Sequence, residues 1–72
     1  MTNTAYTSEG IRIRIGDRLT DKTMTKVYEV KKIDSVFVYV TEILTDSCGE
    51  ETEGEKSCYS YSGTEKQLYF WE

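Results

Sequence analysis

The sequence contains no histidine and no proline, and it has only two cysteines. Without histidine, the chain lacks the side chain that most often acts as a general base near neutral pH. It also lacks a nucleophile elbow, a phosphate-binding glycine-rich loop and any metal-ligand spacing. No apolar run approaches the roughly 20 residues that a membrane-spanning helix needs. These absences predict a protein that is not an enzyme, holds no cofactor or metal and does not enter a membrane.

The two cysteines, Cys48 and Cys58, lie outside any C-x-x-C pattern and cannot complete a tetrahedral zinc site within one chain. They are interpreted either as reduced structural thiols or, in an oxidising compartment, as a disulfide. The N-terminus has no basic start and no apolar centre, so we expect no secretion signal and a cytoplasmic protein.

The 72 residues suffice for one domain near the lower size limit for independent folding. Charge is uneven: residues 1–41 carry a net +2 and residues 42–72 a net −6, giving −4 overall. The sequence analysis therefore divides the chain into a flexible N-terminal arm over residues 1–9 and one domain over residues 10–72.

Apolar residues alternate with polar ones in several short segments, which is the period of a β-strand. Strands are expected over residues 10–15, 25–33, 36–43, 57–61 and 67–71, with a β-bulge at Lys31-Lys32 and a turn at Asp34-Ser35. The predicted core comprises Ile11, Ile13, Ile15, Leu19, Tyr28, Val30, Ile33, Val36, Val38, Val40, Leu68 and Phe70. A one-residue slip in the third strand would exchange Phe37 and Tyr39 with the valines.

Two segments interrupt this alternation. Residues 45–56 contain two glycines and a run of acids, which predicts an irregular, solvated loop. A loose divalent-cation site is the weaker interpretation, because the run lacks the spacing of a calcium-binding loop. Ser62 and Glu65 have the spacing of a helix capping box, so one short helical turn is expected near residues 62–66.

Five short strands joined by tight turns predict an all-β fold, either a small antiparallel barrel or a strongly bent sheet. A Gly16-Asp17 bend is followed by Tyr28-x-Val30-x-x-Ile33, a tight turn and Val36-x-Val38-x-Val40. This order resembles the SH3-like small barrels over about residues 10–43. The resemblance implies a five-stranded sheet folded over a small core, and an open antiparallel sheet is the alternative.

More aromatic side chains are present than so small a core holds, which favours a protein-binding module. The expected contacts are Phe37, Tyr39, Tyr69 and Trp71, with Glu50, Glu51, Glu53 and Glu55 attracting a basic partner such as a nucleic-acid-processing enzyme. Small acidic inhibitors from phages and mobile elements, including anti-CRISPR and anti-restriction proteins, share this profile of length and charge. The competing interpretation is that the aromatics cover the edges of the domain itself.

Two further hypotheses remain. Arg12, Arg14, Arg18, Lys31 and Lys32 would form a basic strip if the chain binds single-stranded nucleic acid, although the net charge opposes this. The segment from Gln67 to Trp71 carries no charge, so two copies would be able to pair through it as an edge strand.

Overall fold

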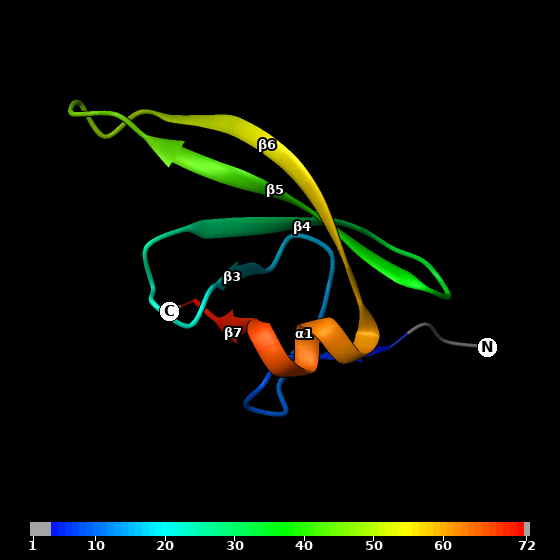
Figure 1. Cartoon of the computed structure of the whole chain (residues 1–72). Helices are drawn as coiled ribbons and strands as arrows, with labels where there is room; N and C mark the ends of the chain where they lie inside the picture. Colours follow the sequence, from blue (N-terminus) through cyan, green and yellow to red (C-terminus); the bar gives the residue numbers. More distant parts are fainter. Residues whose placement is uncertain (1–3, 72) are drawn as a thin grey trace.

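The computed structural model describes residues 4–71. Its elements in chain order are β1 (Ala5–Tyr6), β2 (Arg12–Ile13), β3 (Arg18–Thr20), β4 (Val27–Ile33), β5 (Phe37–Thr45), β6 (Glu51–Ser60), α1 (Tyr61–Gln67) and β7 (Tyr69–Phe70) (Figure 1). β1 and β2 pair as a small antiparallel sheet, and the other strands form an antiparallel sheet in the order β6-β5-β4-β3-β7. The predicted mainly β, five-stranded architecture is therefore confirmed. Within the described residues the sheet is open, with β6 and β7 as its edges, so the SH3-like closure is not confirmed.

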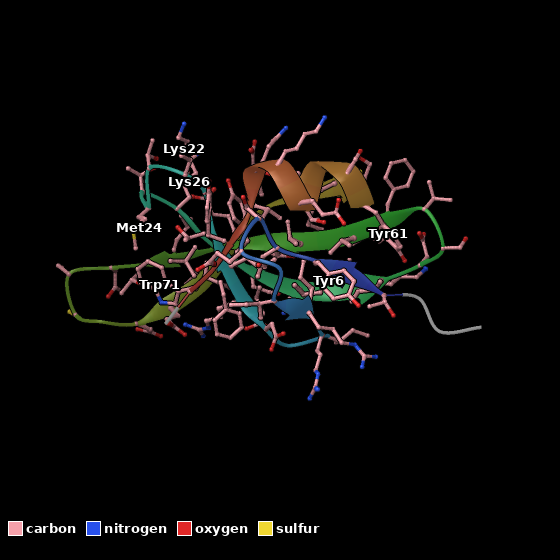
Figure 2. All side chains as sticks on the ribbon, turned by 90° about the horizontal axis from the view of Figure 1, so that it is seen from below. Tyr6, Lys22, Met24, Lys26, Tyr61 and Trp71 are labelled. Atoms are coloured by element: carbon pink, nitrogen blue, oxygen red, sulfur yellow. The ribbon has the colours of Figure 1, made fainter. Side chains whose placement is uncertain are left out.

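The core lies between one face of the five-stranded sheet and a layer made by α1, β1 and β2 (Figures 1 and 2). Strand register places Leu19 opposite both Tyr28 and Phe70, and Val30 opposite Val40, so these side chains share the covered face. The buried cluster consists of Ala5, Ile13, Leu19, Tyr28, Val30, Val38, Val40 and Leu68. Ile33 and Phe70, two further predicted core residues, are partly buried against it.

The core prediction is wrong at three positions, where the side chains are exposed: Ile11 is 40% exposed, Ile15 is 66% exposed and Val36 is 56% exposed. β2 is only two residues long because the chain turns on both sides of it, at Gly10 and Gly16, which both have positive φ. Ile11 and Ile15 lie in those turns and leave the alternating pattern. Val36 lies in the turn before β5, where its backbone N–H donates to the Asp34 carboxylate.

Bulges bend the sheet at two places. The predicted bulge at Lys31-Lys32 is confirmed by the register shift between Val30 and Lys32. A second shift falls between Thr41 and Ile43 in the pairing of β5 with β6. A bulge inserts an extra residue on one strand and increases its local twist.

The predicted irregular loop over residues 45–56 is wrong. Only the turn near Asp46–Glu50 is irregular, and β6 begins at Glu51 and pairs with β5 along nearly its whole length. The resulting hairpin projects past the rest of the sheet (Figure 1). Pairing with an apolar, β-branched strand stabilises a segment whose own Glu and Gly content disfavours a strand.

The chain end is more helical than expected. The expected turn near residues 62–66 is a seven-residue helix, and its N-cap is Ser60, whose Oγ accepts from the Gly63 N–H at 3.1 Å, rather than Ser62. The predicted strand over residues 67–71 shortens to two residues. Part of the predicted N-terminal arm pairs as β1, where Ala5 is buried; residues 1–3 lie outside the described residues.

Candidate recognition face

The open face of the sheet is the face opposite α1, and strand register places all four predicted contact aromatics on it. Phe37 and Tyr39 alternate with the buried Val38 and Val40. Tyr69 pairs with Thr20, the neighbour of the core residue Leu19, and so points away from the core. The backbone N–H of Trp71 bonds to the Arg18 carbonyl, which continues this alternation by one residue. Four side chains far apart in sequence therefore share one face.

The four aromatics form two groups. Phe37 and Tyr39 meet edge to face with ring centroids 6.3 Å apart, and Lys32 Nζ lies 5.6 Å from the Tyr39 ring centroid. Tyr69 and Trp71 lie on and just after β7, at the opposite edge of the sheet beyond β4 and β3. The structure thus brings the two groups to one face but not into contact.

A groove of about 640 Å³ runs beside Tyr69 and Trp71 and is also lined by Met24. Met24 is 65% exposed and has a φ of 59°, an uncommon backbone conformation for a residue other than glycine. Asp21 supports this turn because its carboxylate accepts from the Thr25 N–H at 3.1 Å and from the Thr23 hydroxyl at 3.0 Å. Figure 2 shows Met24 and Trp71 at the same end of the molecule. Sequence reasoning placed Met24 in a polar connection and missed it.

Five charged side chains form a chain of ion pairs across the open face. Arg18 on β3 makes two hydrogen bonds of 2.7 Å to Glu51 on β6, and it lies 4.0 Å from Glu29 on β4. Lys31 lies 2.8 Å from Glu29 and 3.4 Å from Glu53 on β6. The hydrogen bonds between Arg18 and Glu51 raise the pKa of Arg18 and hold the pKa of Glu51 below its ordinary value. The ion pairs therefore tie the far part of β6 to β3 and β4.

The ion pairs involve only some members of the predicted acidic set and of the predicted basic strip. Glu51 and Glu53 are paired with bases, whereas Glu50 and Glu55 are exposed and have no base within ion-pair distance among residues 4–71. Of the predicted basic strip, Arg18, Lys31 and Lys32 lie on the open face. Arg12 belongs to β2 and Arg14 to the turn after it, so neither joins the other three.

A second hollow, of about 340 Å³, lies beside Tyr39 over the buried Thr41. Lys31, Glu53 and Lys56 also line it. Interaction with the Asp34 carboxylate, together with burial, raises the pKa of the Tyr39 phenol. The phenol is therefore protonated at neutral pH, and its O–H is directed to Asp34 at the rim of this hollow.

Both cysteines are free and exposed, with Cys48 in the tip of the β5–β6 hairpin and Cys58 opposite Tyr39. In the part of the chain that the structure describes, no three His, Cys, Asp or Glu side chains are grouped to hold a metal ion. Nor do residues 4–71 include a helix long and apolar enough to cross a membrane.

No protein-family model matches this chain, and neither a curated protein nor a solved structure matches it. The inferences that follow therefore depend on the geometry and charge of its own residues.

Proposed function

We propose that this chain is a non-catalytic protein-binding module that acts as a small acidic inhibitor or adaptor of a partner with a basic groove. One observation carries the proposal: Phe37, Tyr39, Tyr69 and Trp71 all lie on the face that α1 leaves uncovered. Tyrosine and tryptophan are enriched in protein interfaces because they bury a large area at low entropic cost. We propose the open, bent sheet as a relative of the SH3-like scaffold.

Charge supports a basic partner. No Lys or Arg lies between residues 33 and 55, which include the whole of β5 and its turn. Glu51 and Glu53 are neutralised by Arg18 and Lys31, which within residues 4–71 leaves Asp46 and Glu50 without a base at the turn of the hairpin and Glu55 further along β6. The hairpin projects beyond the rest of the sheet (Figure 1). Negative charge on such a projection is expected to raise the rate of association with a positively charged groove. Grooves of this kind occur in nucleic-acid enzymes, which are the expected targets of phage-type inhibitors.

The test is a comparison of matched surface variants. Phe37 on the open face and Tyr6 on β1 have similar exposures, 38% and 42%, so Phe37→Ser and Tyr6→Ser remove similar aromatic surface at different places. The tagged chain is used to isolate a partner, and the two purified proteins are then titrated by calorimetry. We expect Phe37→Ser or Trp71→Ser to weaken binding about tenfold or more, as for interface hot spots, and Tyr6→Ser to have little effect. Equal affinity of all variants, or no partner that binds stoichiometrically, would refute the proposal.

Single-stranded nucleic-acid binding is the second candidate, and Lys32 stacked near the Tyr39 ring is the observation that favours it. Its weakness is that Arg18 and Lys31 already bond to carboxylates. Phosphate contacts would have to displace those carboxylates. Fluorescence anisotropy with single-stranded DNA and RNA at low salt decides the question, and no binding at micromolar protein removes this candidate.

A further inference from the structure

The outer edge of β6 is the longest unpaired strand edge in the described chain. β6 spans ten residues and pairs with β5 on one side, and no strand within residues 4–71 pairs with its other side. Figure 1 shows it as the outermost strand of the sheet. An edge strand presents backbone N–H and C=O groups that can pair with another strand.

The opposite edge is shielded. β7 has only two residues, and its Phe70 N–H already donates to the Glu9 carboxylate at 2.8 Å. The carbonyl of Leu68, just before β7, accepts from the Ser8 N–H. The turn between β1 and β2 therefore occupies the groups through which the sequence analysis expected two copies to pair.

Only half of the β6 edge is suited to pairing. In the N-terminal half of β6 the register shift falls at Gly54 and Glu55. The ion pairs of Glu51 and Glu53 hold that half toward Arg18 and Lys31. Bulges and charges of this kind protect an edge. From Lys56 to Ser60 the pairing with β5 is regular, and the four residues after Lys56 are uncharged. The pairing segment is bounded by the bulge on one side and by α1 on the other.

We propose that two copies of this chain pair antiparallel through residues 56–60, with a two-fold axis at Cys58. A two-fold axis perpendicular to the sheet makes the strands antiparallel and keeps each face on the same side. In this register Lys56 lies opposite Ser60 of the second copy, and Cys58 lies opposite Cys58. No like charges meet: Ser57 lies opposite Tyr59, and only the Lys56–Ser60 pair at each end includes a charge. The residues of this segment are exposed, apart from the partly buried Tyr59.

Pairing would join the two five-stranded sheets into one and place both open faces on the same side. The inference does not rest on the proposed function, since it concerns the backbone edge of β6 rather than the open-face aromatics. The two are tested separately, because Phe37→Ser is expected to leave self-association unchanged.

The first test is light scattering combined with size-exclusion chromatography under reducing conditions. A five-residue pairing is a small interface, so the dimer fraction is expected to rise between about 10 µM and about 1 mM protein. Cys58→Lys places two ammonium groups opposite each other and is expected to abolish the dimer. Cys48→Lys makes the same change at the exposed hairpin tip and is expected to retain it. A wild-type monomer at every concentration, or a dimer that survives Cys58→Lys, would overturn the proposal.

The second test uses the native thiols. Opposite residues in an antiparallel pair have Cα atoms about 4.5–5.5 Å apart, which suits a disulfide. With diamide as the oxidant, wild type and Cys48→Ser are expected to form covalent dimers readily and Cys58→Ser to form few. Because Cys48 is also exposed, its cross-linking in Cys58→Ser measures random collision. Equal cross-linking by Cys48→Ser and Cys58→Ser would contradict the two-fold axis at Cys58.

Discussion

A few fully buried side chains account for most of the packing in this molecule. Leu19, Val30 and Val38 have no measurable exposure, and Ile13 closes the cluster from β2 with 2%. A domain of this length retains a net stability of only about 3–5 kcal/mol from its core. Removing one such side chain is therefore expected to consume most of the stability.

Ile13 and Ile15 test this directly, because they differ in burial but not in chemistry. Ile13→Ala is expected to lower the free energy of unfolding by about 2–5 kcal/mol, since it leaves a cavity in the core. Ile15→Ala is expected to change it by less than about 0.5 kcal/mol, because Ile15 is 66% exposed. Urea denaturation followed by circular dichroism measures both values. If the two variants lost similar amounts of unfolding free energy, the conclusion that Ile13 is buried and Ile15 is exposed would be contradicted.

A second comparison concerns the start of α1. Ser60→Ala removes the oxygen that accepts from the Gly63 N–H and is expected to cost about 1 kcal/mol of stability. The spacing of Ser62 to Glu65 suggests the cap in the sequence, but within residues 4–71 the Ser62 side chain hydrogen-bonds only to the Ser60 hydroxyl. Ser62→Ala is therefore expected to cost less than half as much in the same denaturation experiment. A larger loss for Ser62→Ala would move the cap to Ser62.

At the scale of elements, β5 and β6 show what local sequence can and cannot predict. β5 was expected because Phe37-Val-Tyr-Val-Thr is β-branched or aromatic throughout, and its alternation also gave the correct faces of Phe37 and Tyr39. β6 was expected only from residue 57 because Glu51-Thr-Glu-Gly-Glu has low strand propensity. Its strand conformation comes from pairing with β5, and such tertiary pairing is not encoded in a short window of sequence.

The turn between β4 and β5 is expected to make stability depend on pH. The Asp34 carboxylate accepts from the Phe37 N–H at 2.6 Å and from the Val36 N–H at 2.8 Å, and these bonds hold the pKa of Asp34 below its ordinary value of 3.8. A lowered folded-state pKa gives stabilisation that is present above the unfolded pKa and lost as pH falls through the folded pKa. The midpoint of thermal unfolding is thus expected to fall as pH drops below 3.8.

Asp34→Asn keeps an oxygen acceptor but does not titrate. Its unfolding midpoint is therefore expected to fall less steeply over the same acidic range, although Glu51 continues to contribute because its pKa is also lowered. Superimposable pH profiles for wild type and Asp34→Asn would show that this turn does not carry the effect.

At the scale of the whole molecule, alternation assigned the aromatics to faces but did not reveal how the open face is held together. The pairing of Arg18 with Glu51 joins residues 33 positions apart on strands that are not neighbours. It depends on how far two bulges bend the sheet, a quantity that residue types alone do not fix. The groove beside Met24 was missed for a similar reason, because it forms only where the β3–β4 turn meets the C-terminal strand.

These ion pairs also link the projecting hairpin to strands β3 and β4 of the body, which has a consequence for dynamics. Residues 44–53 are all exposed, whereas Val30, Val38 and Val40 lie in the core. Segments with few buried contacts open locally with a lower free energy than the core does. At about 1 M salt the screening length falls to about 3 Å, so the hairpin loses much of this electrostatic support.

Hydrogen exchange followed by NMR is expected to show this separation. Salt, or Arg18→Gln at low salt, is expected to speed exchange of the amides in residues 44–53 and leave those of Val30, Val38 and Val40 unchanged. Lys22→Gln is the matched control, because Lys22 makes no ion pair within the described part of the chain. If the hairpin and core amides instead respond together, the molecule unfolds as one unit, and the acidic tip is presented to a partner by a rigid sheet rather than by a separately mobile hairpin.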